Sequence, residues 1–240
     1  MQVAAVIPTY NEAENLPRLL SALFSLPLDL SVLVIDDNSP DGTGELAEQL
    51  RAVYPALHVL RRPSKQGLRL AYLSGFRHVL QWDTEAIAQM DADLSHDPAV
   101  LPRMFEALQS CEVVLGSRYV AGGSVDVRWP LWRRWLSRFG NLYARTILSL
   151  PLRDVTTGYR LWKKEALQKM PLERIQSNGY IFLVEMAYLA YRMGYRFSEV
   201  PIYFSERKWG KSKMSLGIQI EAAIRVWQVR IAYRDIQAHS

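Results

Sequence analysis

The chain has 240 residues, 49% hydrophobic and 22% charged, and a net charge of +5. This composition excludes a disordered chain, and the single cysteine, Cys111, excludes an intramolecular disulfide. We therefore predict one globular α/β domain with a substantial core, which includes Cys111. The basic excess predicts an anionic partner, although charge alone does not choose among nucleic acid, lipid headgroups and phosphorylated substrates.

Targeting and membrane-spanning signals are missing from the sequence. The apolar residues 3–7 have no basic flank, so we expect no signal peptide and no export. Charged residues interrupt every apolar stretch before it reaches the roughly 18 residues that a membrane span needs. These features predict a cytoplasmic protein.

Short apolar runs, each typical of a buried strand, occupy residues 3–7, 32–35, 57–60, 86–90 and 113–115. Helix-sized segments separate them, and this alternation predicts a mainly parallel sheet flanked by helices. Asn11 and Glu14 have capping-box spacing, and Asp97 precedes a proline, so a helix is expected to begin at each place. In such sheets ligands bind at the loops that follow the strands.

Two later segments, 132–148 and 214–233, combine apolar and arginine residues at helical spacing. The first has an apolar stripe with arginines opposite: Trp132, Trp135, Leu136, Phe139, Tyr143 and Ile147 against Arg134, Arg138 and Arg145. The second repeats the pattern with Ile220, Ile224, Trp227 and Ile231 beside Arg225, Arg230 and Arg234. Two interpretations stay open, packing against the sheet and contact with a lipid interface.

Two carboxylates, Asp91 and Asp93, end the fourth predicted strand. In extended chain this spacing puts both side chains on one side. Such a pair is costly unless a cation joins it, and oxygen ligands suit Mg²⁺ or Mn²⁺, which can bridge a diphosphate. Solvated loop carboxylates are the plainer interpretation of an isolated Asp-x-Asp, and the position at a strand end favours the metal.

The second predicted strand also ends in acid, at Asp36 and Asp37, before the turn-forming residues 38–43. A carboxylate here could accept hydrogen bonds from a base or a ribose. A rival motif, G-x-G-x-x-A, occupies residues 42–47, and Arg61 and Arg62 could then hold the 2′-phosphate of NADP. The preceding aspartates would repel a pyrophosphate, so an oxidoreductase is the second choice.

Basic residues recur on later loops and helices, and most such cations are simply solvated. Arg133 and Ser137 differ because they lie one helical turn apart and can point at one phosphate. The loop 207–213 contains Gly210 and could close over a diphosphate. The four histidines lack zinc-ligand spacing, and no serine-hydrolase or P-loop motif occurs.

Several motifs, in order along nearly the whole chain, resemble those of family 2 glycosyltransferases and, among these, of the dolichol-phosphate (polyprenyl-phosphate) mannose synthase branch. They occupy residues 7–12, 34–43, 90–96, 116–119, 154–161, 179–182, 199–202 and 209–213. The resemblance implies a nucleotide-sugar transferase fold, the Rossmann-like GT-A fold. It also implies a catalytic domain at 1–205 with an interface helix near 128–149, then a mobile basic loop and a C-terminal amphipathic helix at 206–240.

The resemblance also implies roles for individual residues. The donor nucleotide sugar would contact Pro8, Tyr10, Glu12, Asp37, Lys65, Asp91 and, in the closing loop, Arg207 and Lys213. Asp91 and Asp93 would hold Mg²⁺ or Mn²⁺, and the catalytic set would be Asp93 with Arg118, Arg133 and Ser137 on the acceptor phosphate. The chain departs from the family pattern at Arg69, where relatives often have glycine, and at Ser95, where some have a metal-assisting glutamine.

The implied reaction is an inverting transfer of mannose from GDP-mannose to dolichyl or polyprenyl phosphate, with UDP-glucose as the alternative donor. An ionised phosphate needs no dedicated base. The expected partners are a membrane surface, on its cytosolic face, and a separate membrane-anchoring subunit, but no nucleic acid. A non-catalytic nucleotide-binding module remains the alternative of another class.

Overall fold

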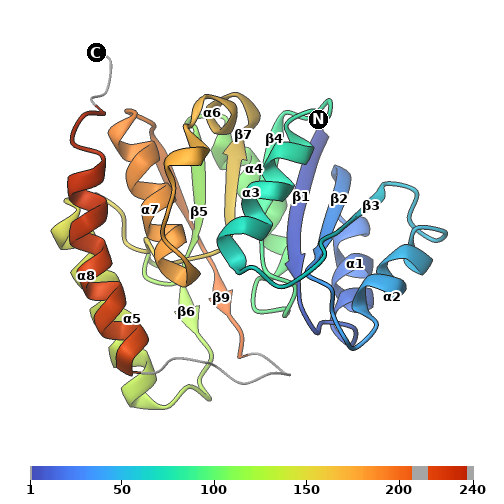
Figure 1. Cartoon of the computed structure of the whole chain (residues 1–240), viewed down its shortest axis with the longest axis horizontal. Helices are drawn as coiled ribbons and strands as arrows, with labels where there is room; N and C mark the ends of the chain where they lie inside the picture. The colour runs from blue at the N-terminus through green and yellow to red at the C-terminus, as the bar shows by residue number, and fades with distance from the viewer. Residues whose placement is uncertain (1, 207–215, 237–240) are drawn as a thin grey trace.

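The structure, a computed structural model, describes residues 2–206 and 216–236, with the backbone alone for residues 216–220. Its main sheet has seven strands in the order β3-β2-β1-β4-β7-β5-β8 (Figure 1). These strands are β1 (Gln2–Thr9), β2 (Asp29–Asp36), β3 (Leu57–Arg61), β4 (Ala86–Gln89), β5 (Val113–Ser117), β7 (Arg160–Lys163) and β8 (Phe197–Pro201). A short second sheet pairs β6 (Ser124–Val125) with β9 (Tyr203–Phe204).

Helices cover both faces of the sheet, as the alternating pattern predicts. They are α1 (Leu16–Phe24), α2 (Thr43–Leu50), α3 (Leu68–Val79), α4 (Leu101–Leu108), α5 (Leu131–Ile147), α6 (Lys164–Lys169), α7 (Gly179–Arg192) and α8 (Leu216–Ala232), with 3-10 turns η1 (Pro98–Val100) and η2 (Leu172–Arg174). Along β1, Val3, Ala5 and Ile7 pack with α1 and α4, whereas Ala4 and Val6 pack with α3 and α7. This period of two gives the sheet one core on each face.

All five predicted strands are present, and the mainly parallel sheet is confirmed. The sequence did not predict β7, which runs antiparallel between β4 and β5, or β8, which pairs with β5 in parallel at the edge. The predicted start of the first helix at Asn11 was wrong, because α1 begins at Leu16 and Asn11 has a φ of 61°. Asp97 does cap the turn at Pro98–Val100, accepting a hydrogen bond from the Ala99 backbone N–H at 2.9 Å.

Most of the apolar stripes of α5 and α8 face outward, but Tyr143 and Ile147 at the end of the α5 stripe pack against the core, so packing accounts for only part of these stripes. Trp132, Trp135 and Phe139 on α5 are 67%, 74% and 54% exposed. The two helices lie side by side beyond α7 (Figure 1), and the indole N–H of Trp227 donates to the hydroxyl of Tyr143 at 3.0 Å. No helix in the described part of the chain is long and apolar enough to cross a membrane.

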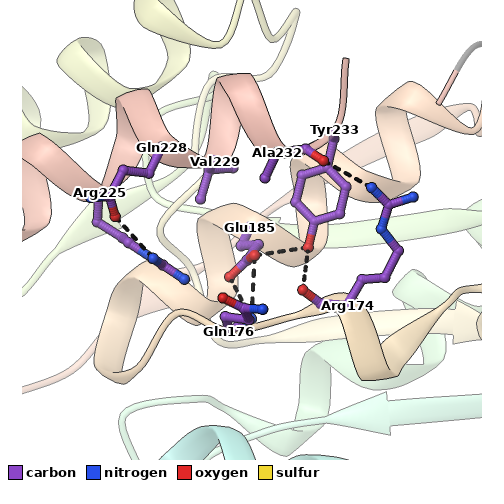
Figure 2. A pocket seen from close by; sticks show the side chains of 8 residues that line it. All are labelled: Arg174, Gln176, Glu185, Arg225, Gln228, Val229, Ala232 and Tyr233. Carbon is purple, nitrogen blue, oxygen red and sulfur yellow. Dashed lines mark hydrogen bonds between the residues drawn. The ribbon is translucent and has the colours of Figure 1, made fainter. Parts of the chain in front are cut away.

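A buried carboxylate fastens α8 to α7 (Figure 2). Glu185 on α7 is 2% exposed and accepts hydrogen bonds from the backbone N–H groups of Gln176 and Ser177 and from the Tyr233 hydroxyl, at 2.8 Å. A cavity of about 210 Å³ lies beside it, between Arg174 and Arg225. Because α8 packs on α5 and α7, it shares their core. The predicted division of the chain into a catalytic domain at 1–205 and a C-terminal segment at 206–240 stays a prediction.

Candidate active site

The loop after β4 presents the predicted metal carboxylates. Asp93 is 5% exposed, and its Oδ1 accepts hydrogen bonds from the backbone N–H and the hydroxyl of Ser95, at 3.0 and 2.6 Å. Leu94 between them has a φ of 60°, a conformation that is uncommon outside glycine. The tight turn and Ser95 together fix the orientation of the Asp93 carboxylate. Ser95, the departure from the family glutamine, therefore acts on Asp93 within the loop.

Tyr72 on α3 fixes the orientation of Asp91. Its hydroxyl donates to Asp91 Oδ1 at 3.2 Å, and the Asp91 backbone N–H donates to His96 Nδ1 at 3.0 Å. Burial, followed by the negative charge of Asp91, raises the pKa of the Tyr72 hydroxyl well above its usual value. The hydroxyl therefore stays protonated and remains a donor. Both carboxylates are thus positioned by neighbours from other parts of the sequence or the same loop.

The donor set fits a hard divalent ion. Asp91 and Asp93 offer oxygen ligands only, and Mg²⁺ commonly uses one or two carboxylates together with substrate phosphates and waters. Gly158 lies beside this loop, where an added Cβ would be 3.3 Å from His96 Cε1 and 3.5 Å from Asp91 Oδ2. Within residues 2–206 and 216–236, no three His, Cys, Asp or Glu side chains gather at a metal-binding distance. The pair therefore suits an ion that completes its shell with phosphate oxygens.

The predicted donor residues meet at the adjacent strand ends. Lys65 Nζ lies 3.6 Å from the centroid of the Tyr10 ring, and Glu12 follows β1 in the same loop. Asp37 directly follows β2 and pairs with Arg62, Oδ1 to Nη1 at 2.8 Å, with both side chains less than 10% exposed. Burial raises the pKa of the Asp37 carboxyl, although Arg62 opposes this. Pro8 lies on β1, in register with Ile35 of β2. One edge of the sheet, at the carboxyl ends of these strands, therefore carries the predicted donor residues Pro8, Tyr10, Glu12, Asp37 and Lys65.

The dinucleotide motif has a different structural role here. A Cβ on Gly44 would lie 2.7 Å from Asp36 Oδ2, so the glycine admits a buried carboxylate where a pyrophosphate would have to dock. The two arginines proposed for a 2′-phosphate are both engaged by carboxylates. Arg61 binds Glu45 at 2.6 Å and Arg62 binds Asp37. This geometry disfavours NADP.

The predicted acceptor residues lie on α5 and the loop after β5. The Arg133 guanidinium carbon lies 3.9 Å from the centroid of the Trp129 ring, and one turn later Ser137 Oγ is 2.7 Å from the hydroxyl of Tyr119. The Arg118 guanidinium carbon lies over the Tyr119 ring, 5.2 Å from its centroid. Tyr119 therefore contacts both Arg118 and Ser137, and Ser137 shares one face of α5 with Arg133.

Two consecutive residues connect this acceptor region to the aspartate loop. The Ser205 hydroxyl donates to the Leu94 carbonyl at 2.7 Å, and the next residue, Glu206, accepts a hydrogen bond from Arg133 Nη1 at 3.2 Å. Leu94 is adjacent to Asp93. Arg133 is thus linked through Glu206 and Ser205 to the loop of Asp93, a connection that their separation of 40 residues in the sequence does not reveal.

Arg118 also takes part in a buried ion pair that the sequence did not predict. Its Nε and Nη2 donate to the two oxygens of Asp154, each at 2.7 Å, and Nη2 also donates to Thr156. Asp154 is fully buried. Two of the three guanidinium nitrogens thus bind protein, and the role of Arg118 toward a phosphate stays a prediction.

Asn141 ties α5 to the loop that contains Asp154. Its Oδ1 accepts from the Val155 backbone N–H at 2.8 Å, and its Nδ2 donates to the Arg153 carbonyl. Asn141 follows Arg133 and Ser137 at intervals of four residues, so the three share one face of the helix. The helix that carries the predicted acceptor residues is therefore fixed to the Arg118–Asp154 pair.

Other predicted residues fall elsewhere. Arg207 and Lys213, and with them the closing loop, lie outside the described residues. Arg69, the departure from the family glycine, donates to Asn178 Oδ1 at 3.1 Å and to the Ile175 carbonyl at 3.2 Å, tying α3 to the segment before α7. Sequence reasoning missed Tyr72, three residues after Arg69, because the sequence does not show which carboxylate the tyrosine reaches.

Comparison with known proteins identifies the family of the chain. The chain matches the family described as Glycosyl transferase family 2 over residues 4–170. It is 46% identical over 234 residues to an undecaprenyl-phosphate mannosyltransferase of Micrococcus luteus, covering 98% of this chain and 96% of that protein. It is 43% identical over 230 residues to a polyprenol monophosphomannose synthase of Mycolicibacterium smegmatis, covering 94% and 86%.

Solved structures of GT-A glycosyltransferases share the fold. A mannosyltransferase from Pyrobaculum calidifontis, in complex with GDP-mannose and Mn²⁺, superposes with a TM-score of 0.65 at 17% identity, over 98% of this chain and 67% of that one. A glucosyl-3-phosphoglycerate synthase from Mycobacterium tuberculosis, with Mn²⁺ and UDP-glucose, gives 0.63 at 17% identity, over 95% and 79%. The oxidoreductase and the non-catalytic module are thereby set aside. The chain is an enzyme with the GT-A fold and belongs to glycosyl transferase family 2.

Proposed function

We propose that the chain transfers mannose from GDP-mannose to a polyprenyl phosphate, with inversion at the anomeric carbon. The observation that carries the proposal is the 46% identity, over 98% of this chain, to an undecaprenyl-phosphate mannosyltransferase. The geometry supports it, because Ser205 and Glu206 link Arg133 to the loop of Asp93. This region thus offers carboxylates for a metal–diphosphate and a cation, Arg133, that would exchange its ion pair with the half-exposed Glu206 for a second phosphate.

The chemistry is a single displacement. Arg133 and Ser137 hold the acceptor phosphate, and Arg118 supports them through Tyr119. A phosphate oxygen, already ionised near neutral pH, forms a bond to the anomeric carbon from the face opposite the nucleotide. The bond from that carbon to the diphosphate breaks, and its electron pair leaves with GDP. A divalent ion, Mg²⁺ or Mn²⁺, held by Asp91 and Asp93 would stabilise the charge on the departing diphosphate.

The remaining donor residues bind the nucleotide. Tyr10, with Lys65 against its ring, and Asp37 line the strand ends where the nucleoside would lie, beside Pro8 and Glu12. Arg207 and Lys213 belong to the same proposal as groups that bind the diphosphate from the 206–215 region. In this arrangement the nucleotide lies over β1 to β3 and the diphosphate reaches the loop after β4.

The proposal is tested by product formation. The purified protein is incubated with undecaprenyl or dolichyl phosphate, Mn²⁺ and radiolabelled GDP-mannose, UDP-glucose or GDP-glucose, and lipid is extracted. We expect label in the lipid fraction from GDP-mannose, lost with chelator. Label from UDP-glucose alone would replace the donor assignment, and no lipid label from any donor would reject the proposal. The anomeric configuration of the isolated product, determined by NMR, tests inversion.

Replacing Arg133 with alanine should mainly impair acceptor use. A hydrogen bond to a charged group contributes about 1.5–3 kcal/mol, so the KM for polyprenyl phosphate should rise about 10- to 100-fold. The donor Kd should stay within about twofold. Arg103→Ala, an exposed arginine on α4, makes the same change in net charge and should alter neither quantity. An unchanged acceptor KM in Arg133→Ala would remove this residue from the proposed phosphate site.

The proposal includes a peripheral position on the cytosolic face of a membrane. Its support is the outward apolar face of α5 and α8, which consists of Leu131, Trp132, Trp135, Phe139, Leu142, Ile224, Trp227 and Ile231. A prenyl chain does not leave a bilayer readily, and aromatic and basic side chains suit the lipid interface. A membrane-anchoring subunit is a further proposed partner.

Membrane docking is tested with anionic liposomes. The double variant Trp132→Gln/Trp135→Gln should bind about tenfold or more weakly than the parent, because each indole loses apolar area that docking would bury. Val53→Gln is the control, since Val53 is 64% exposed outside this face. If the parent fails to bind, or the double variant binds as well as the parent in co-sedimentation, docking through this face is wrong.

A further inference from the structure

The arginine proposed for the acceptor phosphate already binds a carboxylate of this chain. Arg133 Nη1 donates to Glu206 Oε1 at 3.2 Å, and the two side chains are 27% and 32% exposed. A single contact at this exposure is a weak ion pair, because water competes for both charges. The Arg118–Asp154 pair differs in each respect, with two contacts of 2.7 Å and nearly complete burial. Glu206 is thus a ligand of Arg133 that a stronger anion can displace.

The backbone of Glu206 is fixed without help from its side chain. Its N–H donates to Asp126 Oδ2 at 3.0 Å, and Asp126 is 2% exposed. The preceding residue is fixed as well, because the Ser205 hydroxyl donates to the Leu94 carbonyl at 2.7 Å. Only the side chain of Glu206 therefore has to rotate for its carboxylate to leave Arg133.

The Arg133 guanidinium has a second support, which remains when the carboxylate leaves. Its central carbon lies 3.9 Å from the centroid of the Trp129 ring, within the range of a cation–π interaction. Trp129 is 6% exposed, and its ring packs edge-on against Phe204 with 5.7 Å between the centroids. The buried ring therefore supports the cation from below, and a phosphate that displaces Glu206 finds the guanidinium already in place.

A phosphate monoester is a stronger ligand for this cation than a carboxylate. It carries a charge of about −1.5 to −2 at pH 7 and three acceptor oxygens, and a guanidinium can bind two such oxygens at once. The product of the proposed reaction is a phosphodiester with a single negative charge, so it binds Arg133 less firmly than the substrate does. The substrate can therefore displace Glu206, which returns to Arg133 as the product leaves.

We propose that Glu206 is an internal competitor for the acceptor phosphate: it occupies Arg133 while no lipid is bound and weakens the binding of substrate and product phosphates alike. This deepens the proposed function and rests on it, because it requires Arg133 to bind the acceptor. The fraction of molecules in which Glu206 holds Arg133 reduces the apparent affinity for either lipid. The consequence is faster release of the lipid-linked product.

The sign of the change in Glu206→Gln tests the proposal. Glutamine keeps the length of the side chain and an acceptor oxygen but removes the charge, so the KM for polyprenyl phosphate should fall about three- to tenfold. The Kd of farnesyl phosphate, measured by calorimetry, and the inhibition constant of the isolated lipid-linked product should fall by similar factors. The donor KM should stay within about twofold. If Glu206 instead serves to position Arg133, the acceptor KM rises and the proposal is wrong.

Controls connect the effect to Arg133. Glu106→Gln removes an exposed carboxylate from α4 and should leave the acceptor KM within about twofold of the parent. In an Arg133→Ala background, Glu206→Gln should have no effect, because the cation for which the carboxylate competes is gone. A fall in KM that persists in that background would contradict the proposal, as would an unchanged KM in Glu206→Gln.

Folding and the proposed function are checked separately. Glu206→Ala is a second neutral variant, and thermal melts show whether each variant folds. Failure of both to fold would overturn the proposal, because the carboxylate would then be needed by the fold. A parent that forms no lipid-linked sugar from any donor would instead reject the proposed function.

Discussion

In the variant Asp93→Asn we expect turnover to fall by at least about 100-fold. The amide oxygen can still accept the hydrogen bonds that Ser95 donates to Asp93 Oδ1, at 3.0 and 2.6 Å, so the loop should keep its shape. What disappears is the negative charge that would hold a divalent ion against the leaving diphosphate. Initial rates of lipid-linked mannose formation at saturating substrates measure the loss.

The matched control is Asp97→Asn, four residues further along. Asp97 is exposed and caps the turn at Pro98–Val100, and asparagine caps as well as aspartate does. This variant makes the same change in charge and should retain near-parental turnover. Stabilisation by Mn²⁺ with GDP in a thermal melt gives a second measurement, which Asp93→Asn should abolish and Asp97→Asn should keep. Parental turnover in Asp93→Asn would contradict the metal assignment.

The strands that the sequence predicted and those it missed differ in how they are buried. β1, β2 and β5 are covered on both faces, so apolar residues run almost unbroken along them. β7 is equally central, but only Leu161 and Trp162 are apolar between two basic residues. Its first residue is a buried arginine that donates hydrogen bonds to carbonyls of the preceding loop. A search for hydrophobic patterns cannot predict a strand that begins with such a residue.

The candidate site likewise contains residues that the sequence predicted and contacts that it could not predict. Asp91 and Asp93 could be predicted because they are close in sequence and end a recognisable strand. Several contacts that orient them or that assemble the acceptor side join residues far apart in the sequence, such as Arg118 and Asp154, whose numbers differ by 36. The sequence also did not decide whether the apolar stripe on α5 faces the sheet or the outside. A helical period shows that one face of a helix is apolar without showing what covers that face.

The largest loss of stability is expected in Asp154→Asn. Asp154 binds both Arg118 Nε and Nη2 at 2.7 Å, with side-chain exposures of 0% and 8%. Removing one partner of a buried pair leaves the other charge uncompensated, which costs about 3–5 kcal/mol. Urea unfolding at pH 7 measures this difference. Glu112→Gln is the control, because Glu112 pairs with the 68% exposed Arg196, and we expect a loss below about 1 kcal/mol.

The pH dependence of this stability difference shows whether the charge of Asp154 is its cause. Burial alone would raise the pKa of the Asp154 carboxyl, but the charge of Arg118 and its hydrogen bonds prevail and hold that pKa below its usual value. A carboxyl with a lowered folded-state pKa stabilises the fold above its unfolded pKa of about 3.9, and this contribution is lost as the pH falls toward the folded value. The stability difference between the parent and Asp154→Asn should therefore be constant from pH 7 to about 5 and shrink below about pH 4. A difference that is as large at pH 3 as at pH 7 would mean that Asp154 stabilises the fold by its shape and hydrogen bonds rather than by its charge.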